Sequence, residues 1–287
     1  MKGTTYELHV VYIDIYLAEV DRGSSSEILE RFRARYPRHR YSSHGLEDAL
    51  LIESINWSTL KLPQFQSLDS NRPLGEQLQE ILTSVPSATS RADIVSTLLT
   101  RLLVDIAQRN KCESILFADS TTRLAERTLT ETAKGRGFSL PWQVSDGISP
   151  YGVGFYYPLR DLLKKELVTF TTLTSPLLTD LVLKQDKISE VSTSSKAVTI
   201  DDLMTQYFES VEEHYPSIVA NVVRTSSKLK PLPQDGDISC CLCGLPVAGG
   251  TDGIYGWSGD QNSVSRTPRS DFQDDVLCYG CSRSING

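Results

Sequence analysis

Residues 113–137 read ESILFADSTTRLAERTLTETAKGRG, and this stretch decides the expected fold. Residues 113–118 fit a short buried strand, a polar turn follows, and residues 123–134 fit a helix. Ser120 or Thr121 can cap that helix, whose first amide groups have no internal partner. The glycine-rich residues 135–137 then end it. In an open α/β sheet, ligands bind where a strand passes through such a turn into a helix.

Six residues in and after this unit are candidates for binding a nucleotide or tRNA. They are Asp119, Ser120, Thr121, Arg123, Lys134 and Arg136. A helix N-terminus offers amide donors to phosphate, and arginine and lysine are the usual phosphate partners. The alternative is a helix cap followed by a solvated helix face. The sequence leaves both interpretations open.

The segments on either side favour an α/β protein. Residues 8–16 form a nearly continuous apolar run, typical of a buried strand in a parallel sheet. Residues 27–36 fit a short helix that Pro37 ends, and residues 91–109 have apolar residues at helical spacing. A second strand and helix are expected over 152–156 and 159–170, with Pro158 at the helix entry.

Five arginines lie within ten residues of the first expected helix and the segment after it. They are Arg31, Arg33, Arg35, Arg38 and Arg40, interleaved with Phe32, Tyr36 and Tyr41. Basic residues beside aromatic ones can follow an RNA backbone and stack on unpaired bases. The alternative, which the pattern favours, is a solvated helix in which Glu27 pairs with Arg31.

Five of the six cysteines lie in the last fifty residues, and Cys112 is expected in the core. Two Cys-x-x-Cys knuckles supply four sulfurs, which matches the tetrahedral preference of zinc. The expected ligands are Cys240, Cys243, Cys278 and Cys281, with Cys241 left over. The 34 residues between Cys243 and Cys278 exceed the usual spacing, and residues 248–275 are expected to form a flexible loop. Redox-active thiols, an iron–sulfur cluster and a catalytic cysteine remain alternatives.

Composition divides the chain of 287 residues into three expected domains, 1–190, 196–232 and 236–287. A Ser/Thr/Lys-rich linker begins near residue 187, residues 200–230 fit a helix, and a proline-rich hinge covers 231–236. The net charge of −7 argues against a uniformly basic nucleic-acid binder. We find no apolar run long enough for a membrane span and no signal peptide, and we expect a soluble intracellular protein without a membrane partner.

Four blocks together resemble the cytoplasmic tRNA 2-thiolation protein 2 family, in order along nearly the whole chain. The blocks are residues 7–14, residues 116–126 continuing to KGRGFSLPW at 134–142, residues 157–167, and the terminal cysteine knuckles. The resemblance implies a PP-loop ATPase-like α/β domain, that is, an adenine nucleotide α-hydrolase-like, Rossmann-type parallel sheet. It also implies that the four cysteines form a zinc-ribbon-like module at the C-terminal end.

The same resemblance implies a function in the cytoplasm. The family acts as the partner of a catalytic subunit, in a heterodimer that makes 5-methoxycarbonylmethyl-2-thiouridine at the wobble position of tRNA Lys, Glu and Gln. Sulfur comes from a thiocarboxylated ubiquitin-related modifier, and ATP is used through the partner. The alternative is an ATP-dependent adenylating sulfurtransferase acting in its own right, with Cys241 as the residue that carries sulfur.

Two departures from the family pattern favour a non-catalytic subunit. The family fold opens with a strand and a Ser-Gly-Gly-type pyrophosphate loop, whereas here the match begins with residues 7–14. We therefore expect an N-terminally truncated domain that lacks its first strand and phosphate loop. In addition, residues 119–142 hold no cysteine that could carry sulfur. No residue is assigned a catalytic role.

Overall fold

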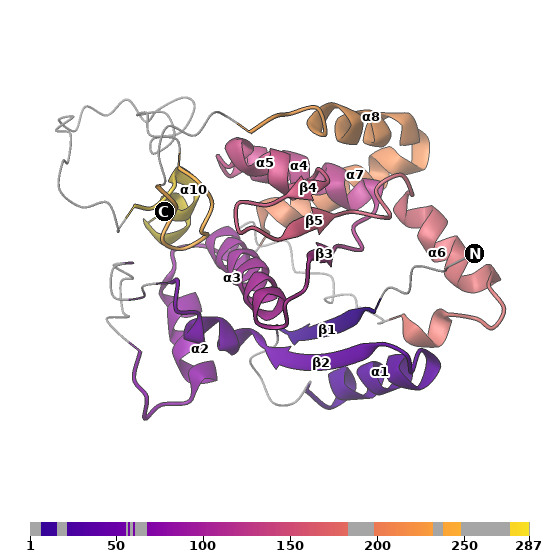
Figure 1. Ribbon diagram of the computed structural model, residues 1–287. Coiled ribbons are helices and arrows are strands. Elements are labelled where there is room, and N and C mark those ends of the chain that lie inside the picture. Colours follow the sequence, from indigo (N-terminus) through magenta and orange to yellow (C-terminus); the bar gives the residue numbers. More distant parts are fainter. Residues whose placement is uncertain are drawn as a thin grey trace.

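The computed structural model describes residues 7–15, 22–55, 57, 60, 68–182, 198–231, 238–247 and 276–286. Helices and strands alternate along much of the chain, as expected for an α/β protein (Figure 1). Short 3-10 helices carry the label η. In chain order the elements are β1 (His9–Asp14), α1 (Arg22–Arg35), β2 (Arg40–Gly45), η2 (Leu46–Leu51), α2 (Leu74–Ser84), α3 (Ala88–Arg109), β3 (Ser114–Leu116), α4 (Thr121–Ala133), η4 (Gly137–Ser139), α5 (Leu140–Gln143), β4 (Gly147–Ile148), β5 (Gly154–Tyr156), α6 (Lys164–Leu173), η5 (Thr179–Leu181), α7 (Ile200–His214), α8 (Pro216–Ser226) and α10 (Tyr279–Asn286).

The strands of the described residues form two small sheets. β1 and β2 pair in parallel, with His9 opposite Arg40 and Asp14 opposite Gly45. In the second sheet β5 lies in the centre, parallel to β3 and antiparallel to β4. The expected α/β class is confirmed. The two strands expected from the apolar runs, β1 and β3, both pair in parallel, but they lie in different sheets.

The stretch that decided the expected fold forms the predicted strand, turn and helix. The hydroxyl oxygen of Ser120 accepts a hydrogen bond from the backbone N–H of Arg123 at 3.2 Å, so Ser120 is the N-cap of α4. Gly135 follows the helix with a φ of +75°, which a residue without a Cβ atom adopts easily. The strand is only partly buried, because Leu116 is about half exposed.

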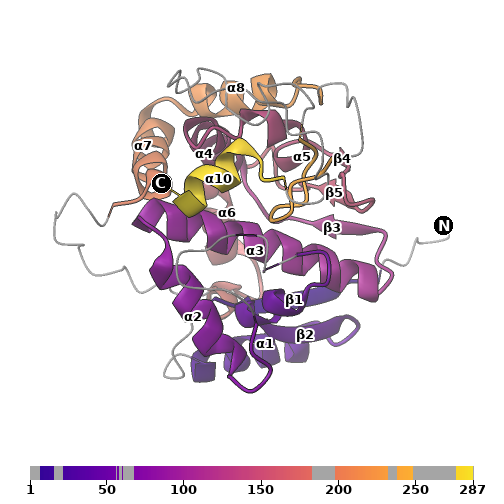
Figure 2. The same cartoon turned by 90° about the vertical axis from the view of Figure 1, so that its left-hand side faces the viewer.

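Helix α3 lies in the middle of the molecule and contributes to both of its cores. Figure 2 shows it running between α1, α2, β1 and β2 on one side and α4, α7 and α8 on the other. One core cluster joins η2, α2 and α3 to both cysteine segments, and the other joins the end of α3 to α4, β5, α7 and α8. The cysteine segments therefore share a core with the main body.

Two helix predictions were wrong in their bounds. Residues 200–230 form two helices, because Pro216 has no N–H to continue α7 and instead starts α8. On α7, Phe208 is buried, but the apolar residues Leu203 and Tyr207 are about half exposed. The helix after β5 begins at Lys164 and not near Pro158.

The late start of α6 results from contacts with the N-terminus of α4. The backbone N–H of Thr121 bonds to the carbonyl of Leu162 at 2.8 Å, and its hydroxyl bonds to that of Arg160 at 2.6 Å. These bonds hold residues 160–162 as a turn. The chain becomes helical only after Leu163, whose N–H bonds to the carboxylate of Glu166 at 2.7 Å.

Several expected connections lie outside the described residues, namely the linker near 187–195, the hinge after residue 231 and the loop 248–275. The three-domain division stays a prediction, although both core clusters cross its boundaries. Across the described ranges, no helix is both long enough and apolar enough to span a membrane.

Candidate metal centre

The first cysteine knuckle is a tight turn. The backbone N–H of Gly244 bonds to the carbonyl of Cys240 at 2.8 Å, and the N–H of Cys240 bonds to the carbonyl of Leu245 at 2.9 Å. Gly244 has a φ of +70°, a conformation that favours glycine. The turn points the side chains of Cys240 and Cys243 into the protein, where both are buried.

The second knuckle opens helix α10. Cys278 precedes the helix, and the backbone N–H of Cys281 lies 3.5 Å from the sulfur of Cys278. The N–H of Cys241 bonds to the carbonyl of Val276 at 2.9 Å and so ties the two knuckles together.

The four sulfurs form one closed group. The Sγ atoms of Cys240, Cys243, Cys278 and Cys281 all lie within 4.8 Å of one another, and none of these cysteines is in a disulfide. The sulfurs of Cys243 and Cys278 are 3.8 Å apart. Four bonds of about 2.3 Å in a tetrahedron place sulfurs about 3.8 Å apart, so the group fits a zinc ion. The spacing prediction is confirmed for the position of these four sulfurs, and Cys241 stands outside the group.

The close approach of the sulfurs shifts the pKa values of Cys240, Cys243 and Cys281 in different directions. Hydrogen bonds with Cys243, Cys278 and Cys281 lower the pKa of the Cys240 thiol well below its ordinary value. Hydrogen bonding to Cys240, with burial in addition, raises the pKa of Cys243 and of Cys281. Burial and these hydrogen bonds therefore disfavour the thiolates of Cys243 and Cys281 when no cation is present. A divalent cation would replace those protons and allow four thiolates to coexist.

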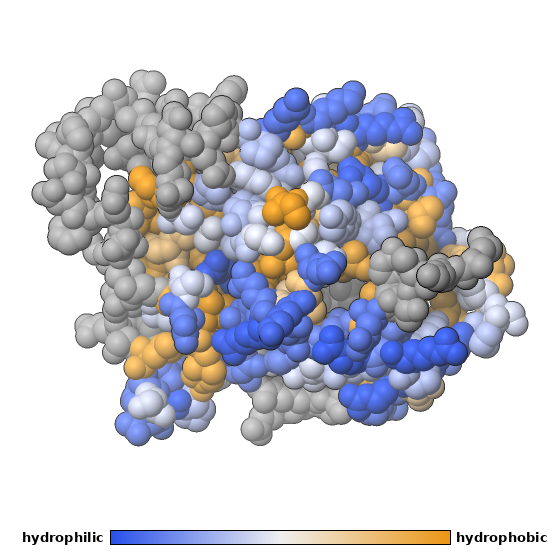
Figure 3. Space-filling view, viewed as in Figure 1, coloured by the Kyte–Doolittle hydropathy of each residue, from blue (hydrophilic) through white to orange (hydrophobic). Residues whose placement is uncertain are grey.

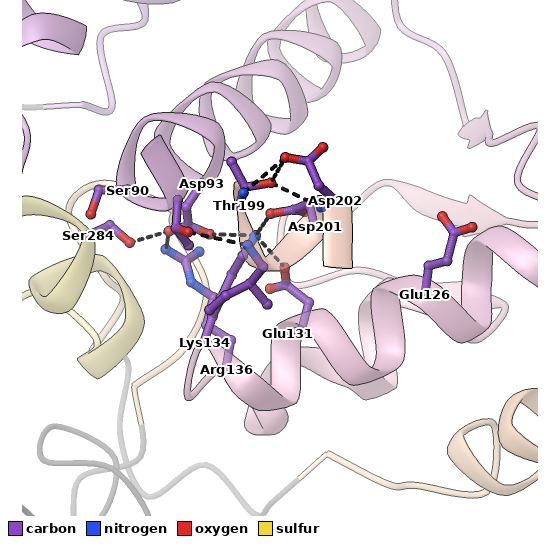
Figure 4. A network of polar contacts seen from close by, with 12 residues as sticks. Ser90, Asp93, Glu126, Glu131, Lys134, Arg136, Thr199, Asp201, Asp202 and Ser284 are labelled. Atoms are coloured by element: carbon purple, nitrogen blue, oxygen red, sulfur yellow. Dashed lines mark hydrogen bonds and ion pairs between the residues drawn. The ribbon is translucent and has the colours of Figure 1, made fainter. Parts of the chain in front are cut away.

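The segment after α4 forms one wall of the centre. Arg136 is buried, and its Nη2 atom lies 3.5 Å from the sulfur of Cys281 and 2.5 Å from Oδ2 of Asp93. Asp93 also accepts from the hydroxyl of Ser284 on α10 and lies 3.6 Å from the ammonium of Lys134 (Figure 4). Burial alone would lower the pKa of Arg136. The charges of Cys281 and Asp93 outweigh burial, and the pKa of Arg136 is raised well above its ordinary value.

Lys134 continues this network away from the sulfurs. Its ammonium lies 2.8 Å from Oδ2 of Asp201 at the start of α7 and 3.9 Å from Oε1 of Glu131 (Figure 4). Burial raises the pKa of Glu131, while Arg136 and Lys134 oppose that shift. The network therefore connects the centre to the helices of the second core.

The six residues proposed for nucleotide or tRNA binding do not meet at one site. Lys134 and Arg136 follow the last turn of α4, whereas Ser120 and Thr121 lie at its first turn, about 20 Å away along a helix of 13 residues. At that first turn Asp119 pairs with Arg127 at 2.8 Å. Asp119 therefore has an ion-pair partner within the fold.

The remaining side chains of the turn are also engaged in the fold. Ser120 and Thr121 are buried, and their hydroxyls bond to backbone groups. Arg123 is half exposed and pairs with Glu126 at 2.9 Å. The helix-cap interpretation accounts for these contacts, and ligand binding at the turn stays a prediction.

Sequence reasoning missed the polar stripe of α3 that faces the centre. Asp93, Thr97 and Arg101 recur every four residues and therefore share one helix face, and all three are buried. The signal that could have revealed this face was a polar residue at every fourth position of a helix whose apolar residues mark another face. Cys112, expected in the core, is only half buried.

The arginine-rich segment lies on the surface of α1 and at the start of β2. Arg31 pairs with Glu27 at 2.6 Å, as the solvated-helix interpretation predicts, and Arg33 pairs with Glu30 at 2.5 Å. Arg33 also lies over the ring of Tyr41 at 5.7 Å. Figure 3 shows hydrophilic side chains covering this part of the molecule.

Comparison with known proteins identifies the family. Residues 199–283, which include α7, α8 and all four clustered cysteines, match the family model described as cytoplasmic tRNA 2-thiolation protein 2. A protein of that name from Phaeosphaeria nodorum is 50% identical over 93% of this chain and 70% of its own length. The chain belongs to the cytoplasmic tRNA 2-thiolation protein 2 family. The family member from Sclerotinia sclerotiorum is 62% identical over 77% of this chain, a match that spans 59% of the relative.

A solved structure shares the fold of this family member. U34-tRNA thiolase NcsA from Methanococcus maripaludis, solved with its 4Fe–4S cluster, matches with a TM-score of 0.53. The match covers 85% of this chain and 68% of the thiolase, at 12% sequence identity. The expected PP-loop ATPase-like α/β fold is thereby confirmed.

Proposed function

We propose that this chain is a non-catalytic subunit of the cytoplasmic complex that 2-thiolates the wobble uridine of tRNA Lys, Glu and Gln. Membership of the 2-thiolation protein 2 family is the observation that carries the proposal. The fold it shares with a U34-tRNA thiolase agrees with that role. In the proposed complex a catalytic subunit binds this chain as a heterodimer, uses ATP, and takes sulfur from a thiocarboxylated ubiquitin-related modifier.

The proposed role of the four cysteines is to hold a structural zinc ion. All four are buried and sit in the core that α2 and α3 share. A closed tetrahedral site of this kind stabilises a fold and leaves no open position for a substrate. A 4Fe–4S cluster, as in the thiolase NcsA, is the other occupant that four thiolates can hold.

The surface proposed for tRNA is the arginine-rich part of α1 and β2. Residues 27–41 contain five arginines against two glutamates, a net charge of +3 in a chain whose total is −7. The ion pairs there are exposed, and exposed pairs contribute little free energy, so phosphates can displace the carboxylates. Tyr36, beside Arg35 and 40% exposed, offers a ring for base stacking.

One observation favours the alternative of a sulfurtransferase in its own right. Cys241 is half buried, lies beside the centre and is not one of its four grouped sulfurs. Incubation with a persulfide donor would then transfer its outer sulfur to Cys241 and leave the donor as a thiol. With tRNA and ATP added, the uridine would be adenylated with release of pyrophosphate, and AMP would leave when sulfur replaces the adenylate. Mass spectrometry that finds every cysteine unmodified, with no AMP formed, removes this alternative.

Deletion of the gene tests the main proposal. We expect 5-methoxycarbonylmethyl-2-thiouridine to disappear from digested tRNA and its unthiolated form to accumulate, as measured by liquid chromatography and mass spectrometry. The full-length gene should restore the thiolated nucleoside. Unchanged thiolation in the deletion strain contradicts the proposal, and thiolation of transcripts by the purified chain alone contradicts its non-catalytic part.

A further inference from the structure

A buried guanidinium lies against each of the two cysteine knuckles. A Cβ atom on Gly244, next to Cys243, would overlap the guanidinium of Arg101, and one on Gly280, next to Cys281, would overlap the side chain of Arg136. Arg101 is 7% exposed and Arg136 is 4% exposed. Because these two positions are glycines, each guanidinium side chain can lie directly against its knuckle.

Arg136 pairs with a buried carboxylate and also contacts a sulfur of the centre. Its partner Asp93 also lies 3.6 Å from the ammonium of Lys134, which pairs in addition with Asp201 and Glu131. The other partners of Arg136 are the hydroxyl of Thr97 at 3.3 Å and the sulfur of Cys281 at 3.5 Å. The contact with that sulfur ties Arg136 directly to the second knuckle.

Arg101 has no carboxylate partner among the residues that the structure describes. Its Nη2 donates to the hydroxyl of Ser54, and its guanidinium lies 5.5 Å from the centre of the Tyr151 ring. The hydroxyl of Tyr151 donates in turn to the carbonyl of Cys243 at 2.5 Å. A buried charge without a counter-charge is costly, so Arg101 requires negative charge near the first knuckle.

Four thiolates around a divalent cation carry a net charge of about −2, which is opposite in sign to the two arginines held against them. We propose that Arg101 and Arg136 are the counter-charges of the metal centre, one held against each knuckle, and that they strengthen its binding of metal. This inference rests on the proposed metal centre. Neither arginine is a metal ligand. Both act on the thiolates through charge, and Arg136 also acts through a hydrogen bond to sulfur.

Substitution of Arg101 in the full chain tests the inference. Arg101→Met keeps a long apolar side chain and removes the charge, whereas Arg101→Lys keeps the charge. We expect zinc affinity, measured by competition with a chromophoric chelator, to fall about 10- to 100-fold for Arg101→Met, as for other groups that support metal ligands. Arg101→Lys should stay within about 3-fold of wild type. The matched control is Arg109→Met, on the same helix but 62% exposed, which should leave the affinity unchanged.

A second measurement separates charge from packing even where a variant folds poorly. The urea midpoint is compared with and without zinc for wild type and Arg101→Met. If Arg101 is a counter-charge, zinc raises the midpoint of wild type by more than that of the variant. If Arg101 only packs, the variant loses the same amount in both states, and the inference is overturned. A wild-type chain that binds no metal overturns the metal centre as well. Wild-type binding with an unchanged zinc affinity of Arg101→Met overturns the inference alone.

Discussion

Gly280, inside the second cysteine knuckle, leaves the space that the side chain of Arg136 fills. The reverse contact lies beside it, because a Cβ atom on Gly135 would be 2.5 Å from the ring of Tyr279. Residues 134–137 and 278–281 therefore interlock, each contributing one glycine and one large side chain. This contact explains why the Lys-Gly-Arg-Gly block belongs with the cysteine knuckles, although more than 100 residues separate them in the sequence.

Replacement of Gly280 by alanine should destabilise the protein. The added methyl group overlaps Arg136, which is held by Asp93 and cannot move away freely. Overpacking of this kind costs about 1–3 kcal/mol of the free energy of unfolding, measurable by urea denaturation. The control is Gly137→Ala, because a Cβ atom there meets nothing within 4 Å. Equal stability of the two variants would contradict the interlock.

The sequence predicted the unit from β3 to α4 because its signals are local. Ser120 needs only the next three residues to cap α4, and Gly135 needs only its own backbone freedom to end it. The cysteine spacing likewise fixed which four sulfurs would meet. These features depend on neighbours along the chain or on a rigid turn.

The buried partners of Lys134 and Arg136 could not be predicted in the same way. Their partners Asp93 and Asp201 come from helices α3 and α7, and only tertiary packing brings them together. The start of α6 depended on bonds from Thr121, about 40 residues earlier. Local patterns show that a basic residue is present, but they do not show whether it faces solvent or a buried carboxylate.

Metal content should separate the four grouped cysteines from Cys241. Cys243→Ser removes one of four ligands and should weaken zinc binding by more than the roughly 100-fold typical of a residue that only supports a ligand. Cys241→Ser should keep one zinc per chain. Mass spectrometry of zinc and iron in the purified chain measures both. Loss of metal in Cys241→Ser, or its retention in Cys243→Ser, contradicts the ligand set, and iron in place of zinc would identify a cluster instead.

The buried carboxyl of Glu131 should make stability depend on pH. Burial raises its pKa, so the folded protein binds this proton more tightly than the unfolded chain does. The contribution of Glu131 to the free energy of unfolding is fully present below the pKa of the unfolded chain, about 4.3. It is lost as the pH rises through the pKa of the folded protein. Each unit of raised pKa corresponds to about 1.4 kcal/mol.

Glu131→Gln should therefore gain stability relative to wild type as the pH rises from about 4.5 to 7. Urea denaturation at a series of pH values measures the difference between the two proteins, in which the contributions of other groups cancel. Glu76→Gln, at an exposed position of α2, should stay within about 0.5 kcal/mol of wild type throughout. A difference for Glu131→Gln that shrinks with rising pH would show that Lys134 and Arg136 outweigh burial.

Neutralising the arginines of α1 should weaken tRNA binding. The triple change Arg31→Gln, Arg33→Gln and Arg38→Gln removes three exposed charges from the proposed tRNA surface. Each arginine that contacts a phosphate adds about one unit to the slope of log affinity against log salt, so filter binding across a salt series should give a flatter line. The control changes Arg72, Arg91 and Arg109, three exposed arginines of other elements, to glutamine and alters the net charge equally. Equal slopes for the two triple variants would place the tRNA on another surface and leave the proposed thiolation function standing.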